Sequence, residues 1–257
     1  MGARAVKWWG WGWDDKSRSI EGFPVLWRYL RLRLNLDPAV HRSVPPIEQV
    51  RIPPSLLSPD ELGELERVVG EGNLSTEHEV RVAHSAGRSY KDLARLRSGV
   101  LLRASDAVQV PGGANEVAGS LAFARRRRYA VIPFGGGTSV VGGVEPLGDG
   151  AYAATLTLDL RRMHLVTGID DPSGLVTAQA GIRGPLLEEA LQARGLTLGH
   201  FPQSWEFSTL GGWVATRAAG GLSNRYGRID DLVVGLRLVT PTRTLEVRAL
   251  PSRDHGP

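Results

Sequence analysis

The feature that most constrains the fold is a run of glycines directly after a short apolar stretch. Residues 130–134 read AVIPF, which predicts a buried strand, and residues 135–139 then read GGGTS. Residues without Cβ let the backbone adopt positive φ and turn successive N–H groups toward one point. That geometry suits a phosphate or diphosphate. An ordinary flexible turn remains the alternative, because glycine patterns alone are weakly specific.

Two common nucleotide-binding loops are excluded by the same stretch. A P-loop requires Lys before its Ser or Thr, and Gly137 occupies that position. A Rossmann turn must open a helix, whereas residues 140–153 contain too much Gly and Pro to form one. Asp159 stands where a Rossmann ribose ligand is expected, and without the helix we interpret this match as coincidence.

A second stretch, residues 199–221, is rich in small and hydroxyl-bearing residues. Gly211 and Gly212 would let the backbone approach a flat or charged ligand closely, and the hydroxyls could supply neutral hydrogen bonds. The same composition is also typical of a helix that packs closely through small residues. His200 is the second residue of this stretch, and for it we favour a structural hydrogen bond over a contact with a ligand.

The remaining pattern predicts an α+β protein without regular βαβ repeats. Ser58, Pro59 and Glu61 predict a capped helix start, and that helix should end at Gly70. Beyond residue 103, short strands and helices alternate. We expect strands over 106–110, 130–134, 155–160, 175–180, 232–239 and 245–247, and helices over 115–127 and 185–194.

Before residue 103 the signals are weaker. Residues 25–36 fit helical and strand spacing, and we favour a helix that packs on its own domain over one that lies on a membrane surface. The tryptophans of residues 8–13 are typical of a cluster that covers an apolar groove of its own protein. The interrupted N-terminus lacks the apolar core of a signal peptide, and we expect a cytoplasmic protein.

Composition excludes several classes of chemistry. The chain has no Cys, which removes disulfides and thiolate catalysis, and no two His residues have the helical spacing of a metal site. A net charge of +4 is a weak argument for nucleic-acid binding, and we expect none. The run Arg125 to Arg128 predicts a solvated helix end, with a phosphate-binding patch as the alternative.

Four motifs together resemble one known family. They are KWWGWGW, PFGGGTSVVGG, GHFPQSWEFSTLGGWVATRAAG and YGRIDDLVVGLRLVTP, in that order. The chain is similar to the N-terminal portion of alkylglycerone-phosphate synthases and their bacterial FAD-linked oxidase relatives. The resemblance implies a vanillyl-alcohol-oxidase-type (PCMH) FAD-binding domain of two α+β subdomains, preceded by a partly helical N-terminal region. It places the domain at 103–257, truncated at its C-terminal end, after a family-specific region at 1–102.

The resemblance also implies the residues that contact the cofactor. Because the first loop has hydroxyl residues where covalently flavinylated relatives often have His, it implies non-covalent FAD. The expected FAD contacts are Pro133, Phe134, Gly135, Gly136, Gly137, Thr138 and Ser139, then Gln203, Ser204, Trp205, Glu206, Phe207, Ser208 and Thr209, and then Thr216, Arg217, Ala218 and Ala219.

The family's later motifs are missing from the chain. Residues 254–257 read DHGP, whereas family members continue into a further FAD-contacting segment and a substrate-binding domain. We therefore expect no catalytic residue here, and whether the chain is itself an enzyme stays open. In the intact family the substrate is a lipid-like acyl-dihydroxyacetone phosphate, which undergoes acyl-to-alkyl exchange in ether-lipid synthesis. The alternatives are part of an FAD-linked 2-hydroxy-acid dehydrogenase and a non-catalytic remnant. Weak membrane-surface contact and, in the intact enzyme, a homodimer are further expectations.

Overall fold

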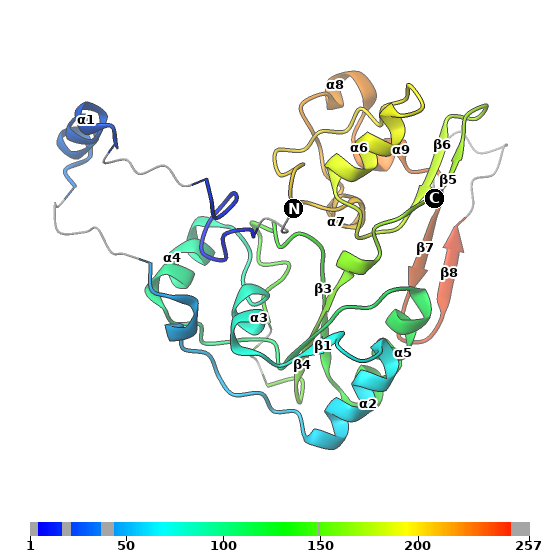
Figure 1. Cartoon of the computed structure of the whole chain (residues 1–257), viewed down its shortest axis with the longest axis horizontal. Helices are drawn as coiled ribbons and strands as arrows, with labels where there is room; N and C mark the ends of the chain where they lie inside the picture. Colours follow the sequence, from blue (N-terminus) through cyan, green and yellow to red (C-terminus); the bar gives the residue numbers. More distant parts are fainter. Residues whose placement is uncertain (1–4, 17–21, 37–43, 147, 149, 248–257) are drawn as a thin grey trace.

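The computed structural model of the chain describes residues 5–16, 22–36, 44–146, 148 and 150–247. Its elements form two units that meet along the middle of the molecule (Figure 1). The helices are α1 (Pro24–Leu34), α2 (Pro59–Val69), α3 (His78–Ala83), α4 (Tyr90–Ser98), α5 (Ala114–Arg127), α6 (Gly184–Gln192), α7 (Leu210–Thr216), α8 (Ser223–Tyr226) and α9 (Ile229–Leu232), with 3₁₀ turns at Ile47–Gln49 and Leu160–Arg162. The strands are β1 (Leu74–Ser75), β2 (Ala107–Gln109), β3 (Ala130–Phe134), β4 (Thr155–Asp159), β5 (Val166–Asp170), β6 (Leu175–Ala178), β7 (Leu236–Val239) and β8 (Thr244–Val247).

The first unit is built on a four-stranded sheet in the order β1-β2-β4-β3. β4 is parallel to both of its neighbours, and Val131 and Phe134 of β3 align with Leu156 and Asp159 of β4. All five residues of β4 are buried, although they alternate between apolar and polar types. Such burial requires that both faces of the sheet be covered.

One face of this sheet is covered by α2 and α5. Leu65 of α2 and Phe123 of α5 are fully buried with Leu156 of β4 in one apolar core. α2 starts as its sequence predicts, since the side chain of Ser58 accepts from the Glu61 N–H and the Glu61 carboxylate accepts from the Ser58 N–H. The arginines at the end of α5 are solvated, as expected, and Arg126 and Arg127 pair with carboxylates of α2.

The other face is covered by α3 and by the turn that joins it to α4. Thr157 of β4 hydrogen-bonds Ser105 at 2.5 Å, and Asp159 at the end of β4 contacts His84. A small core of Val50, Val82 and Leu96 lies beneath α3 and α4. α4 was not expected from the sequence, because its nine residues carry few apolar side chains and it depends on the Ser89–Asp92 capping box.

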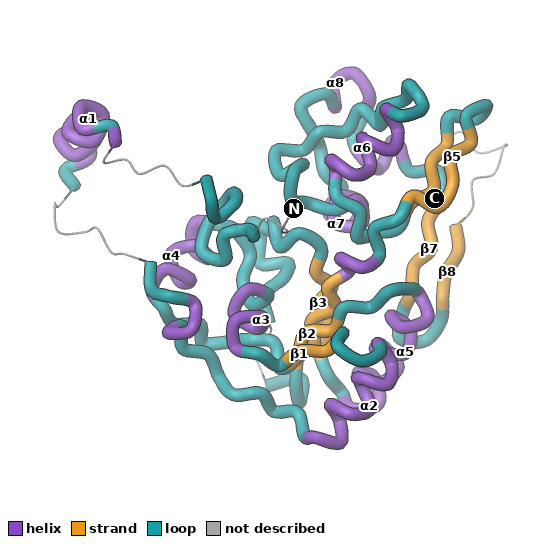
Figure 2. Tube along the Cα trace, in the orientation of Figure 1, coloured by secondary structure: helices purple, strands orange, loops and turns teal. Residues whose placement is uncertain are grey.

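The second unit contains two antiparallel hairpins, β5–β6 and β7–β8, and the helices α6 to α9. Figure 2 shows the short helices α6, α7 and α8 beside the hairpins, to their left in this view. Its core holds Leu187 of α6, Trp213 of α7 and Ile229 of α9. The strand expected over 232–239 starts four residues later, because residues 229–232 form α9. The Asp231 carboxylate caps the start of this helix by accepting from the Arg228 N–H.

The expectation that residues 25–36 pack on their own domain is wrong for the described structure. They form the predicted helix, but no residue of α1 is buried, and Val25 and Leu32 are 83% and 74% exposed. Within the described part of the chain, no helix has the length and apolar character needed to cross a bilayer. Membrane-surface contact by this segment stays a prediction.

Candidate functional site

The glycine-rich loop lies where a parallel strand of the first unit ends. β3 delivers the chain into residues 135–139 beside the end of β4, and such carboxyl-terminal strand edges are the usual ligand sites of parallel sheets. Gly137 is buried and has φ +65°, a region that L side chains rarely adopt. A Cβ there would also lie 2.5 Å from the ring of Phe134, so position 137 requires glycine.

Most backbone N–H groups of this loop have no acceptor in the part of the chain that the structure describes. Among the described residues, none of the N–H groups of residues 136–140 donates a hydrogen bond, and these residues belong to no helix or strand. The side chain of Ser139 accepts instead, from the Gly143 N–H at 2.9 Å and from the Val141 N–H at 3.4 Å. Five consecutive donors beside a strand end form a cradle that fits an anion such as a diphosphate.

The second expected segment, residues 203–209, lies directly against the first. A Cβ on Gly136 would collide with the carbonyl oxygen of Phe207, and a Cβ on Gly135 would collide with the hydroxyl of Thr209. The structure therefore brings together two stretches that are about seventy residues apart in the sequence. Their contact closes one side of the glycine loop with backbone and a hydroxyl group.

Internal hydrogen bonds fix the backbone of residues 203–209. The carbonyl of Ser204 accepts from the N–H groups of Phe207 and Ser208, both at 2.8 Å, and the Ser208 hydroxyl accepts from the Trp213 indole at 2.7 Å. Trp205 packs against Gly184 and Phe201. Gln203 and Glu206 are exposed, Ser204 is half-buried, and Ser208 and Thr209 are buried.

The third expected segment, residues 216–219, makes no hydrogen bond to the other two within the described structure. Thr209 precedes α7 and Thr216 ends it, so the seven-residue helix separates the two ends by about 10 Å. Arg217 adopts φ +50° and its guanidinium binds Asp230 at 2.6 and 2.9 Å, which lowers the pKa of that carboxyl. No hydrogen bond joins residues 216–219, all of them described, to the glycine loop.

His200 has no hydrogen bond in the described structure, contrary to the structural role favoured for it. Its side chain is 2% exposed, both ring nitrogens lack a partner, and its ring meets Trp213 edge-on. Burial lowers the pKa of the imidazole, so the ring is neutral at pH 7. An unpartnered buried imidazole beside residues 203–209 fits a polar ligand group there.

Several residues at the loop escaped sequence reasoning. His84 lies 4.5 Å from the ring of Phe134 between ring centres, and its Nε2 contacts the Asp159 carboxylate at 2.8 Å. Asp159 is buried, and burial alone would raise its pKa, but hydrogen bonds from His84 and Arg161 outweigh that effect and lower it. No local pattern relates His84 to Asp159, because 75 residues separate them in the sequence.

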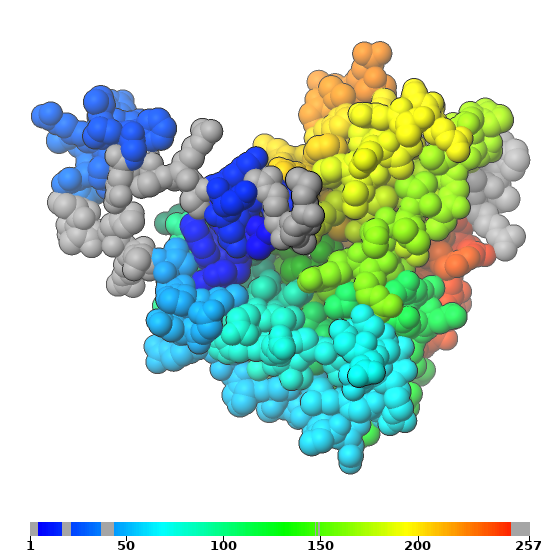
Figure 3. All heavy atoms as spheres, in the orientation of Figure 1, coloured from blue at the N-terminus to red at the C-terminus, as the bar shows by residue number. Residues whose placement is uncertain are grey.

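The N-terminal tryptophans also contact the site. Residues 5–16 form a small hairpin closed by the Val6–Trp13 bridge, and the indole of Trp13 donates to Glu206 at 2.6 Å. The ring of Trp13 lies 5.1 Å from that of Phe207. Figure 3 shows this hairpin, in dark blue, between the first unit and the second. Trp8 packs against the core of Val50, Val82 and Leu96, whereas Trp11 is 42% exposed, so the expected cover over an apolar surface is present only in part.

The described part of the chain offers no metal centre. Its residues include no group of three or more His, Asp or Glu that could hold a metal ion. What the geometry offers is a loop with five backbone N–H groups that lack an acceptor among the described residues, a fixed adjoining segment and a buried imidazole.

Comparisons with known proteins agree with this arrangement. The profile of the family described as "FAD binding domain" matches residues 105–247. An alkyldihydroxyacetonephosphate synthase from Dictyostelium discoideum is 39% identical over 202 residues, 79% of this chain, and the mitochondrial D-2-hydroxyglutarate dehydrogenase of Bos taurus is 33% identical over 195 residues, 76% of this chain. A solved structure of an alkyldihydroxyacetonephosphate synthase superposes on 95% of this chain with a TM-score of 0.83 and 34% identity. The chain spans 33% of the length of each curated relative and 49% of the solved chain.

Proposed function

The chain belongs to the FAD-binding domain family, and on that premise we propose that it holds FAD non-covalently as the FAD-binding part of an alkyldihydroxyacetonephosphate synthase-like flavoenzyme. The observation that carries the proposal is the run of five backbone N–H groups, residues 136–140, that have no acceptor among the described residues. A diphosphate would accept from them without any cationic side chain in the loop itself.

Each part of the site has a separate task in this proposal. Residues 135–140 bind the diphosphate, and Gly135 and Gly136 let residues 207–209 close the cradle from one side. His200, neutral and buried, offers one ring N–H and one acceptor nitrogen to a polar edge of the cofactor. Residues 216–219 extend the surface along α7 toward the far end of a long ligand. FAD, when bound, supplies the electron-accepting ring that no side chain provides.

The reaction itself is proposed for a longer protein that includes these residues. The 39% identity to the Dictyostelium synthase and the TM-score of 0.83 support exchange of an acyl for an alkyl group on an acyl-dihydroxyacetone phosphate. The 33% identity to a D-2-hydroxyglutarate dehydrogenase supports a second candidate, oxidation of a 2-hydroxy acid. A FAD-binding site alone does not decide between them, because function lies in the substrate site.

Titration of the chain with FAD, followed by flavin fluorescence, tests the binding proposal. We expect saturable binding that is released on denaturation, and an affinity at least about tenfold weaker in Gly137→Ala, because a Cβ at positive φ costs about 1–2 kcal/mol and meets the Phe134 ring. Gly174→Ala is the matched control, since Gly174 has φ +66° in open space in the β5–β6 turn. Binding of NAD but not FAD would refute the assignment.

Adding substrates to FAD-loaded protein that includes the longer sequence separates the two reactions. A 2-hydroxy-acid dehydrogenase should lose its visible flavin absorbance when D-2-hydroxyglutarate is added without oxygen. Exchange without net oxidation should instead convert an acyl-dihydroxyacetone phosphate and a fatty alcohol into the alkyl product and a released fatty acid, with the oxidised flavin spectrum retained at the end. Bleaching by the hydroxy acid with no exchange would favour the second candidate.

A further inference from the structure

The turn between α3 and α4 lies against the end of the glycine loop. The backbone N–H of Arg88 donates to the carbonyl oxygen of Ser139 at 2.7 Å, and a Cβ on Gly87 would collide with that same oxygen. A residue without a side chain at position 87 therefore permits this approach. Both residues precede residues 105–247, the part that the family profile matches.

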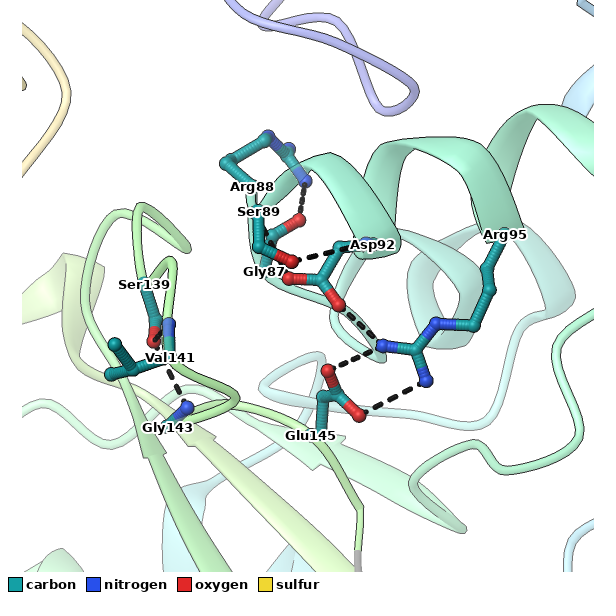
Figure 4. Close-up of polar contacts among 9 residues, drawn as sticks. All are labelled: Gly87, Arg88, Ser89, Asp92, Arg95, Ser139, Val141, Gly143 and Glu145. Carbon is teal, nitrogen blue, oxygen red and sulfur yellow. Dashed lines mark hydrogen bonds and ion pairs between the residues drawn. The ribbon is translucent and has the colours of Figure 1, made fainter.

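A second contact holds the chain six residues after Ser139. The guanidinium of Arg95 on α4 donates to both carboxylate oxygens of Glu145, at 2.5 and 3.2 Å, and to Asp92 at 2.5 Å (Figure 4). Between the two contacts, the Glu145 N–H donates to the Gly142 carbonyl and the Ser139 hydroxyl accepts from the Gly143 N–H. Residues 139–145 are thus held at both ends by one helix and its preceding turn.

α4 is itself firmly positioned. Its N-terminal capping box joins Ser89 to Asp92, and the Asp92 side chain is only 1% exposed. Leu96, one turn further on, is buried in the core with Val50 and Val82. Arg88 is 8% exposed and its guanidinium donates to the carbonyl oxygens of Gly87 and Lys7. The element that contacts the loop is therefore anchored in the core rather than exposed at the surface.

The Ser139 contact also fixes the direction of a donor. In a trans peptide the carbonyl and the N–H of one unit point in opposite directions, and no described peptide bond is cis. Because the Ser139 carbonyl points at Arg88, the N–H of Val140 in the same peptide unit points away from α4. Val140 supplies the last of the five N–H groups that lack an acceptor.

The geometry points to Gly87, the Arg88 backbone and the Arg95–Glu145 pair as a positioning clamp for the diphosphate-binding loop. The clamp holds the Ser139–Val140 peptide with its N–H presented to the ligand, so the anion meets donors that are already oriented. This inference rests on the proposed function. It assigns to residues outside the matched domain a role in binding the diphosphate and no role in binding the flavin ring.

Two substitutions test the clamp through the two ends of the loop. Gly87→Ala should displace Ser139 and weaken FAD binding about tenfold or more, the effect of losing one hydrogen bond to a charged group. Glu145→Gln should weaken it about threefold, as expected for a partly exposed ion pair. On charge alone, removing this carboxylate would tighten the binding of an anion. Weaker FAD binding by Glu145→Gln would therefore show that Glu145 acts by positioning the loop.

Each variant has a matched control elsewhere in the first unit. Gly63→Ala, the control for Gly87→Ala, adds a methyl group where no atom lies within 4 Å. Glu64→Gln, the control for Glu145→Gln, removes a carboxylate that pairs with Arg126. The side chains of Glu64 and Glu145 are similarly exposed, at 34% and 29%. Both should bind FAD as the wild type does. Riboflavin, which carries no phosphate, should bind all five proteins equally, because the clamp acts on the diphosphate.

The outcomes separate this inference from the proposed function. Failure of the wild type to bind FAD would overturn both. If the wild type binds FAD and the two clamp variants bind it equally well, the clamp alone is wrong. Equal losses for FAD and riboflavin would show a general loss of structure and would also refute the clamp. If circular dichroism shows that Gly87→Ala is unfolded, Glu145→Gln decides the question.

Discussion

At the scale of single residues, adjacent glycines of the loop serve different contacts. Gly137 is required by its backbone conformation, whereas Gly135 and Gly136 are required because residues 207–209 occupy the space of a side chain. The sequence alone suggested that Gly136 makes room for a diphosphate. The structure adds that the missing Cβ of Gly136 makes room for the Phe207 carbonyl. This glycine therefore permits the contact between the glycine loop and residues 207–209.

Gly136→Ala should therefore push the loop and residues 207–209 apart. We expect FAD binding to fall at least about tenfold, because the added carbon collides with a backbone oxygen that has no free rotamer to move into. Equilibrium dialysis with FAD measures the loss. Gly168→Ala, in an open position of β5, should leave the affinity unchanged. Wild-type affinity in Gly136→Ala would mean that the two segments need not touch.

At the scale of elements, one hydrogen bond joins α2 to the start of β3. The hydroxyl of Tyr129 donates to Glu61 at 2.6 Å, and Glu61 also closes the capping box of α2. Burial and then the Glu61 carboxylate raise the pKa of Tyr129 to about 12. The hydrogen bond from Tyr129 in turn lowers the pKa of Glu61. The Tyr129–Glu61 pair therefore connects the start of α2, the helix that covers the sheet, to the start of β3 within that sheet.

Tyr129→Phe should lower the free energy of unfolding by about 1–2 kcal/mol at pH 7. Because the folded pKa of Tyr129 is raised above its usual value near 10, its contribution is complete below pH 10 and is lost as pH rises toward about 12. Urea unfolding at pH 7 and between pH 10 and 12 should show this loss in the wild type and not in Tyr129→Phe. Tyr152→Phe is the control, since its hydroxyl makes no hydrogen bond in the described structure and its loss should change neither value. An unchanged alkaline loss in Tyr129→Phe would assign it to another group.

At the scale of the whole molecule, the main core crosses the expected domain boundary. Leu57 and Leu65 precede residue 103, yet they are buried with Phe123 and Leu156 of the matched domain. β1 likewise joins the sheet through β2. The division at 102/103 stays a prediction, but the first unit draws its core from both sides of that point.

A chain reduced to residues 105–247 should therefore fail to fold cooperatively. It would lose the burial of Leu57 and Leu65 and leave Phe123 exposed, at about 2–5 kcal/mol for each large side chain, which is comparable with the net stability of a domain. Thermal unfolding followed by circular dichroism measures this. A chain starting at residue 44 keeps that core and should unfold in one transition. A sharp transition of the 105–247 chain at the full-length temperature would show that the domain is independent.

The sequence predicted some elements of the fold well and others poorly. The capping box of α2 and the helix over 114–127 depend on neighbours in sequence, and they were predicted close to their observed ends, whereas the first strand of the last hairpin begins at Leu236 and not at 232. α4 and α9 were missed, because short helices with few apolar residues are stabilised by caps and packing. α1 was predicted as a helix, but its lack of buried contacts was not.

The sequence by itself determined that a glycine-rich loop with a free backbone follows a strand, since three consecutive glycines leave the backbone unrestricted wherever they lie. The motifs also predicted which distant stretches would share a cofactor. Only the tertiary structure decided that residues 207–209 fill the space beside Gly136, that His200 is buried without a partner, and that Arg88 and Arg95 hold the loop from outside the matched domain. The reason is physical: backbone conformation depends on adjacent residues, whereas contacts between segments fifty or more residues apart depend on how the whole chain packs.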